Sequence, residues 1–267
     1  MTPAIQADSP SRWFDLQRLH NETLCRRIVF HAECSSTSTD ALTLARSDAP
    51  LPLLVLTDTQ TAGRGRGSNQ WWAGEGALTF SLLLAPSEFG ISRETYPLVS
   101  LTAALAVSEI LREFAPECQV GLKWPNDVHL NGRKVCGILV EPPPGLNDRL
   151  VLGIGLNVGN SLREAPEELR SIATSIIDEA GRAHRLHEVL ECLLNELSKQ
   201  FRTLGQGALP LRERWQQQCV LTGKDVVLQS GDHRVEGACH GIADSGAILI
   251  ASDGGPRAHF GGTVRLK

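Results

Sequence analysis

The stretch that most narrows the choice of fold is residues 120–141. Two runs with apolar residues at alternating positions, VGLKWPNDVHL and RKVCGILVE, flank the dipeptide Asn131–Gly132. Asn and Gly tolerate the positive φ angles of a two-residue turn, so this dipeptide between two such runs is a strong hairpin signal. The sequence therefore predicts an antiparallel hairpin with strands over 120–130 and 133–141.

The remaining pattern predicts a mixed α/β domain followed by a small β domain. Apolar runs predict further strands over residues 27–32, 51–58, 77–85 and 149–159. Helical spacing predicts helices over residues 40–46, 97–114, 185–201 and 211–218. After residue 222, short apolar runs alternate with Gly, Asp and Ser turns, which is typical of a small β-barrel. We expect a polar, loosely tied lead-in over 1–26, an α/β domain over 27–220 and a β domain over 221–267.

Composition excludes several classes of protein. The formal net charge of -4 gives no overall attraction to nucleic acid or to an anionic membrane. Seven cysteines, an odd number with no Cys-x-x-Cys pair, favour free thiols in a reducing compartment. The N-terminal residues lack the apolar segment of a signal peptide, and the longest apolar run is too short to span a bilayer. We therefore expect a cytoplasmic protein with neither a DNA nor a membrane partner.

A glycine-rich loop, TAGRGRGSNQWW, follows the strand expected over 51–58. It leads into another strand, so it is not the strand-to-helix turn of a dinucleotide-binding fingerprint, and no Gly-Lys-Ser/Thr marks a P-loop. Glycines let backbone amides approach an anion, and Arg64 and Arg66 add planar donors suited to phosphate or carboxylate. Trp71 or Trp72 could stack on a base. The alternative is a flexible surface loop with solvated arginines.

Three further groups of polar residues are candidates for a site. Lys123 lies on an apolar strand before Trp124–Pro125, and the proline holds the preceding residue extended; the alternative is an edge-strand lysine that reaches solvent. The hydroxyl run over residues 35–39 could bind a neutral polar ligand or simply cap a helix. Asn157 could bind a ligand or form a turn. No zinc-ligand spacing, nucleophile elbow or carboxylate pair is evident, so we expect no metal site built by protein ligands.

In combination, these motifs resemble the biotin–protein ligases. The order is GRGR, a tryptophan a few residues later, KWPND, the hairpin ending in KVCGILVE, GIGLNV and a small C-terminal β domain. The resemblance implies a mixed-sheet catalytic domain like that of class II aminoacyl-tRNA synthetases, which binds biotin and ATP, followed by an SH3-like β-barrel. It also implies a ligase that forms biotinyl-5′-AMP, with ATP and Mg²⁺ as co-substrate and ion. The biotinyl group then passes to one lysine of a biotin carboxyl carrier domain.

The resemblance also implies roles for individual residues. The biotin contacts would be Ser36, Thr37, Ser38, Gln60, Arg64, Gly65, Arg66 and Lys123. The ATP or adenylate contacts would be Arg66, Trp71, Lys123 and Asn157. Lys123 and Arg66 would carry the catalysis, and the glycine-rich loop would be a cationic lid, disordered when empty. Ser38 departs from the family pattern, because many relatives have Asn there.

The sequence also bears on domain content, assembly and alternative functions. Only about 26 residues precede the first strand expected from the sequence, too few for the DNA-binding domain that some members carry, so the resemblance is to the monofunctional class. A homodimer is one possible assembly. A lipoate or octanoate ligase or transferase of the same fold is one alternative function, and a non-catalytic biotin-binding protein is the other.

Overall fold

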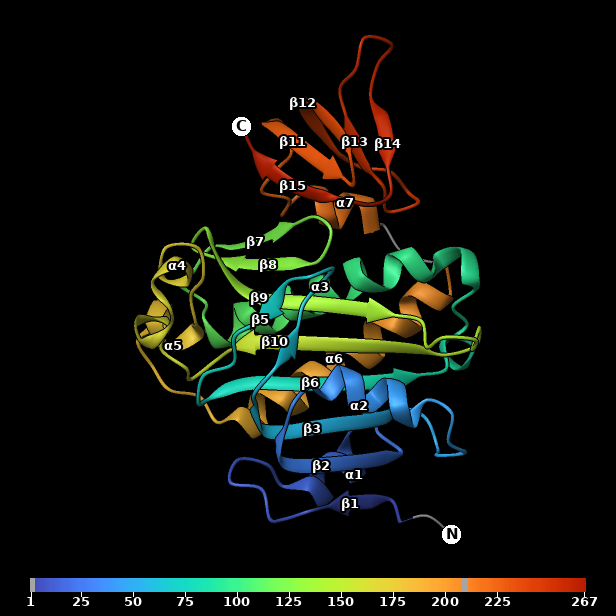
Figure 1. Cartoon of the computed structure of the whole chain (residues 1–267), viewed down its shortest axis with the longest axis vertical. Coiled ribbons are helices and arrows are strands. Elements are labelled where there is room, and N and C mark those ends of the chain that lie inside the picture. The colour runs from blue at the N-terminus through green and yellow to red at the C-terminus, as the bar shows by residue number, and fades with distance from the viewer. Residues whose placement is uncertain (1–2, 208–210) are drawn as a thin grey trace.

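A large mixed sheet forms the centre of the molecule in the computed structural model, which describes residues 3–207 and 211–267 (Figure 1). Eight strands lie side by side in the order β1-β2-β3-β6-β10-β9-β8-β7. Their bounds are β1 (Ile5–Ala7), β2 (Arg27–Cys34), β3 (Leu53–Gln60), β6 (Ala77–Leu84), β7 (Val120–Lys123), β8 (Asp127–Leu130), β9 (Arg133–Glu141) and β10 (Leu150–Asn157). β1, β2 and β3 run parallel, and the other neighbours pair antiparallel. The α/β prediction is therefore confirmed.

Helices cover both faces of this sheet. The long helices α3 (Tyr96–Phe114) and α6 (Leu186–Gly205) pack into the main apolar core. On the other side, α2 (Thr37–Leu44) packs on β3 and β6 and contributes Ala41 to a smaller apolar cluster. The shorter helices are α1 (Leu16–Glu22), α4 (Glu167–Arg170), α5 (Ile176–Ala180) and α7 (Leu211–Gln216), with 3₁₀ turns η1 (Pro86–Phe89), η2 (Arg93–Thr95) and η3 (Leu162–Glu164). Because α2 is short, the sheet face beside it has room for a cavity.

The hairpin predicted at Asn131–Gly132 joins β8 to β9. Leu130 pairs with Arg133, and the two turn residues have φ angles of 48° and 83°, as a turn with two positive φ angles requires. The strand expected over residues 120–130 is instead two strands, β7 and β8, which pair antiparallel with each other. The chain reverses at Trp124–Pro125–Asn126, because Pro125 has no N–H to continue a ladder. This reversal puts Lys123 directly opposite Asp127.

The C-terminal residues form the antiparallel β domain that the sequence predicts. Its sheet has the order β14-β13-β12-β11-β15, and the strands are β11 (Asp225–Ser230), β12 (His233–Ile242), β13 (Ile248–Ile250), β14 (Arg257–His259) and β15 (Thr263–Leu266). Trp124, which is 3% exposed, donates from its indole Nε1 to the Gly246 carbonyl at 2.9 Å. The β domain is thereby attached beside the β7–β8 turn (Figure 1).

The N-terminal segment differs from the loosely tied lead-in expected from its polar composition. β1 adds a parallel strand at the edge of the sheet next to β2. Asp8 accepts from the Ala32 backbone N–H at 2.9 Å, and the buried Arg27 donates to the Pro3 carbonyl at 3.0 Å. A buried guanidinium needs such partners, so the segment packs as part of the α/β domain. Within the described residues, no helix is long and apolar enough to cross a membrane.

Candidate active site

A cavity of about 1140 Å³ opens between the sheet and the C-terminal β domain. Its walls come from the start of α2, the glycine-rich loop, the β7–β9 hairpins, β10, the loop before α5, and strands β11 and β15. All of the site residues expected from the sequence line it: Ser36, Thr37, Ser38, Gln60, Arg64, Gly65, Arg66, Trp71, Lys123 and Asn157. Residues spread over more than a hundred positions of the sequence thus meet in one place.

One end of the cavity is rich in hydroxyl groups. The Thr37 N–H donates to Gln60 Oε1 at 2.9 Å, and the Thr37 and Ser38 hydroxyls lie 2.9 and 3.0 Å from Ser81 Oγ. Ser36 is the N-cap residue of α2, but its side chain makes no capping hydrogen bond, so capping does not account for this run. Ser81, on β6, is a member of the cluster that the sequence pattern did not reveal, because it looks like an ordinary residue of a buried strand. The cluster can donate to and accept from a polar ring.

Glycines on the central strands make the floor on which Trp71 rests. A Cβ atom at Gly155 would overlap the Trp71 indole ring, and one at Gly137 would lie 3.2 Å from Trp71 Cζ3. Both glycines line the cavity beside the ring. The backbone of β9 and β10 therefore allows the Trp71 ring to lie close against the sheet at the wall of the cavity.

We expect Gly155→Ala to push Trp71 off this floor. The resemblance implies that Trp71 contacts the adenylate, and an aromatic contact of this kind contributes about 0.5–1.5 kcal/mol, so the Kd of the nucleotide should rise about two- to tenfold. Nucleotide titrations followed by tryptophan fluorescence measure this. Gly159→Ala is the matched control, since a Cβ there meets only Gly76 atoms at 3.6 and 3.8 Å, and equal affinities for the two variants would contradict the assignment.

The glycine-rich loop forms a short hairpin in the structure, and whether it becomes disordered in the absence of ligand stays a prediction. β4 (Gly63–Arg64) pairs with β5 (Gln70–Trp71), and the Gly65 N–H donates to the Asn69 carbonyl at 2.8 Å. Trp71 anchors the hairpin on the floor, and Arg66 anchors it on the C-terminal domain. These two contacts hold the glycine-rich hairpin against the rest of the structure.

The two arginines of this loop have different partners. Arg64 forms a two-pronged ion pair with Glu141, in which Nη1 lies 3.2 Å from Oε1. Arg66 Nη1 instead donates to the Gly262 backbone carbonyl at 2.8 Å. Burial lowers the pKa of Arg66, and the nearby Asp127 carboxylate partly offsets this, but an arginine stays protonated in either case. Arg66 therefore keeps its net positive charge at the cavity.

Lys134 is a second lysine of the cavity that the sequence pattern did not single out. Its Nζ lies 2.6 Å from Asp127 Oδ1 and 5.8 Å from the centre of the Trp71 ring. Asp127 is the one carboxylate among the described lining residues, and it faces Lys123 across the β7–β8 pair. The predicted hairpin brings β9 back beside β8, but the contact between Lys134 and Asp127 is evident only in the folded sheet. Lys123, Lys134 and Arg66 together make this end of the cavity cationic.

Asn157 has a structural partner as well as a place in the wall. It ends β10, is 2% exposed, and donates from Nδ2 to the Thr174 carbonyl at 2.9 Å. That bond holds the segment 171–174, from which Ile172 extends with 61% of its surface exposed. Leu162 and Leu169 lie in the same apolar wall of the cavity. Asn157 thus supports this part of the cavity wall through its bond to Thr174.

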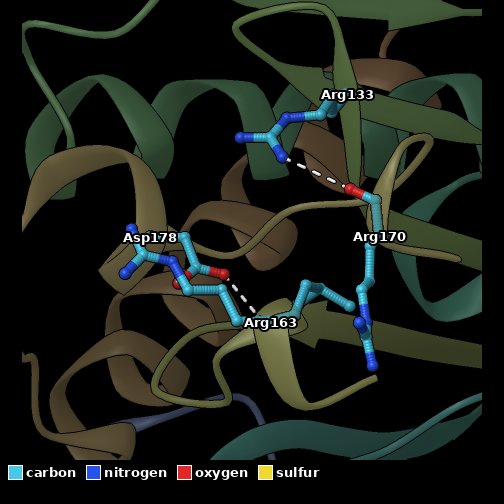
Figure 2. Close-up of a pocket in the computed structure, with 5 residues that line it drawn as sticks. Arg133, Arg163, Arg170 and Asp178 are labelled. Carbon is cyan, nitrogen blue, oxygen red and sulfur yellow. Dashed lines mark hydrogen bonds and ion pairs between the residues drawn. The ribbon is translucent and has the colours of Figure 1, made fainter. Parts of the chain in front are cut away.

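A smaller hollow of about 310 Å³ lies behind this wall, lined by Arg133, Leu162, Arg163, Arg170 and Asp178 (Figure 2). Its guanidinium groups point in different directions rather than toward one centre (Figure 2). Asp178 accepts from the Leu162 N–H at 2.7 Å and from the Ser161 hydroxyl at 2.8 Å. These bonds lower the pKa of Asp178 although its burial acts in the opposite direction. The bonds of Asp178 hold the loop from which Leu162 reaches the larger cavity.

Comparison with known proteins identifies the family. The model of the biotin/lipoate A/B protein ligase family matches residues 32–157, which contain both the glycine-rich loop and KWPND. The bifunctional ligase/repressor BirA of Bacillus subtilis is 33% identical over 253 residues, covering 93% of this chain and 76% of that protein. This chain belongs to the biotin protein ligase family.

Other members of the family support this assignment. The biotin–[acetyl-CoA-carboxylase] ligase of Mycobacterium tuberculosis is 31% identical over 228 residues, covering 84% of this chain and 83% of that ligase. The biotin protein ligase of Aquifex aeolicus, solved with biotin and ATP, superposes with a TM-score of 0.77 at 31% identity, covering 90% of this chain and 99% of that one. The resemblance inferred from the motifs is confirmed, as are the fold class and the ligase activity. The lipoate or octanoate alternative is not favoured by these relatives.

Proposed function

We propose that this biotin protein ligase activates biotin with ATP as biotinyl-5′-AMP and then transfers the biotinyl group to one lysine of a biotin carboxyl carrier domain. The observation that carries the proposal is the single cavity in which a hydroxyl-rich end meets a cationic end. The Aquifex aeolicus relative, solved with biotin and ATP, supports both substrates. The carrier as partner is supported by the names of the curated relatives.

The hydroxyl-rich end suits the ring system of biotin. The cyclic urea of biotin offers N–H donors and a carbonyl acceptor, and serine and threonine hydroxyls can meet either kind of group. We assign Ser36, Thr37, Ser38 and Gln60 to this end. Ser38 is shorter than the Asn of many relatives, but its hydroxyl belongs to the same cluster through Ser81. We assign Arg64, Gly65 and Arg66 to the binding of the biotin carboxylate.

The cationic end suits the first half-reaction. A carboxylate oxygen of biotin attacks the α-phosphorus of ATP, a new P–O bond forms, and the bond from phosphorus to the pyrophosphate oxygen breaks. Both reactants are anions that repel each other, so fixed positive charge at the junction lowers the barrier. Lys123, Lys134 and Arg66 supply that charge, while Trp71 and Asn157 serve the adenylate side.

The second half-reaction needs a neutral amine on the carrier lysine. That amine attacks the acyl carbon of the mixed anhydride, an amide bond forms, and AMP leaves with the oxygen that it shared with the acyl group. The nitrogen must lose a proton, and Asp127 is the carboxylate in place to accept it. Its ion pair with Lys134 holds the Asp127 carboxylate at the wall of the cavity.

Mg²⁺ fits this cavity as an ion carried by the nucleotide. Within residues 3–207 and 211–267, no three His, Cys, Asp or Glu side chains come together as a metal site. Mg²⁺ commonly uses phosphate oxygens and waters with only one or two carboxylates, and Asp127 is the available carboxylate. When bound, the ion would screen the charge of the departing pyrophosphate.

We propose a cytoplasmic location and no DNA partner, with a homodimer as one possible assembly. All seven cysteines are free thiols, which supports a reducing compartment such as the cytoplasm. The predicted independence from DNA and the option of a homodimer rest on the sequence alone.

The function is tested by incubating the protein with biotin, ATP, Mg²⁺ and an unmodified carrier domain. We expect the carrier to gain the mass of one biotinyl group, and a carrier with its acceptor lysine changed to Arg should gain nothing. Substitution of lipoate or octanoate for biotin should leave the carrier unmodified. A carrier labelled by lipoate as readily as by biotin would contradict the proposal.

A further inference from the structure

Arg66 on the glycine-rich hairpin is held by the C-terminal β domain. Its Nη1 donates to the Gly262 carbonyl at 2.8 Å, between residues 196 positions apart, and both residues line the active cavity. We propose that this carbonyl is a positioning group for Arg66, so that the C-terminal domain holds the guanidinium over the bound adenylate and thereby retains the intermediate. This inference rests on the proposed function and assigns a role to the second domain.

The fold of the β domain fixes the direction of this carbonyl. Gly262 has a φ of 125°, and a Cβ there would lie 2.7 Å from both the Gln229 carbonyl oxygen and Leu228 Cδ1. β15 begins at the next residue and pairs with β11, where Thr263 lies opposite Gln229. A close approach and a left-handed backbone together require glycine at this position. The carbonyl is therefore placed by β-strand pairing and not by a flexible tail.

The contact orients Arg66 without neutralising its charge. A guanidinium has five N–H donors, and the bond to Gly262 uses one of them, which leaves the others for an anion. Arg64 on the same hairpin shows the contrast, because Glu141 compensates its charge with a carboxylate. Arg66 meets only a neutral carbonyl there and lies half-buried at the cavity. It thus remains available to bond the negatively charged adenylate.

The test compares Gly262→Ala with Gly261→Ala. Enzyme loaded with biotin and ATP is separated from free ligand, and release of biotinyl-5′-AMP is followed over time. Gly262→Ala should displace the carbonyl and speed release about tenfold, the lower range for a lost hydrogen bond to a charged group. A Cβ at Gly261 meets only Arg66 Nη2 at 3.9 Å, an ordinary contact, so this control should stay within about twofold of the wild type. Equal release from the two variants would overturn the proposal.

A double-mutant cycle separates this role from general damage to the β domain. If Gly262 acts through Arg66, Gly262→Ala should add nothing to the release rate of an Arg66→Gly enzyme. A further tenfold increase in the double variant would show an independent effect and overturn the proposal. Arg66→Lys leaves the β domain unaltered, so it decides the case if Gly262→Ala does not fold. We expect Arg66→Lys to release the adenylate faster than the wild type, because an ammonium lacks the planar fork that can bond the Gly262 carbonyl and the adenylate together. Release as slow as in the wild type would contradict the proposal.

Failure of this inference is distinct from failure of the proposed function. The wild-type protein either forms the adenylate and labels the carrier or does not, whatever holds Arg66. Only the release rates of the variants report on Gly262.

Discussion

Lys134→Ala is expected to slow both half-reactions, whereas Lys123→Ala slows adenylate formation alone. Each change removes a positive charge from the point where carboxylate and phosphate meet, and loss of such a group costs about 100- to 1,000-fold in rate. Lys134 also lies 2.6 Å from Asp127, so its removal disturbs the residue that we propose as the proton acceptor for the carrier lysine. Lys123 lies opposite Asp127 in the β7–β8 pair, but among the described residues its side chain forms no ion pair with that carboxylate.

Two single-turnover assays separate these effects. Biotin-dependent pyrophosphate release reports the first step, and transfer from added biotinyl-5′-AMP to the carrier reports the second. Arg133→Ala is a control that removes a neighbouring charge on β9, and Arg133 contacts Glu179 rather than the active cavity. If Lys134→Ala kept a normal transfer rate, the pair with Asp127 would have no part in the second step. If Lys123→Ala kept normal pyrophosphate release, Lys123 would be structural.

Arg66→Gly is expected to make an enzyme that releases its reactive intermediate. Loss of a hydrogen bond between a charged donor and the adenylate is worth about 1.5–3 kcal/mol, or about 10- to 150-fold in dissociation. The free mixed anhydride acylates exposed lysines, so bystander proteins should become biotinylated in an ATP-dependent manner. Adenylate formation is less affected, because Lys123 and Lys134 still offset the charge of the two reactants.

A streptavidin blot with albumin in place of the carrier measures this leakage. Arg64→Gly is the matched control on the same hairpin, since Arg64 is engaged by Glu141. We expect a strong bystander signal from Arg66→Gly and a weaker one from Arg64→Gly. An equal, faint signal from wild type and Arg66→Gly, with normal adenylate synthesis, would contradict the role of Arg66 as the group that retains the intermediate.

Features set by local sequence were predictable, and features set by distant contacts were not. The Asn131–Gly132 turn and the helix over residues 97–114 follow from residue-level conformational preference and apolar spacing, and both are present. The split of the expected strand at Pro125 is local too, but the sequence pattern alone did not show that the chain would reverse there. The N-terminal strand β1 was missed because its pairing with β2 depends on a neighbouring strand and not on its own short sequence.

The site shows the same division. The motif residues were found because they lie in recognisable segments, and they do line one cavity. Ser81 and Lys134 were missed because their importance comes from a hydroxyl on α2 and a carboxylate on β8 that only the folded sheet brings near. The contacts of the glycine-rich hairpin could not be predicted either, since they involve the floor beneath Trp71 and a carbonyl of the second domain.

The most direct test of the central claim, that one cavity joins biotin to AMP, is exchange of labelled pyrophosphate into ATP without any carrier present. Reversible formation of biotinyl-5′-AMP requires that label enter ATP only when biotin, ATP and Mg²⁺ are all supplied. We predict exchange with biotin, no exchange with lipoate or octanoate, and a rate lowered about 100- to 1,000-fold in Lys123→Ala. Exchange that does not depend on biotin, or none with any of the three acids, would contradict the account.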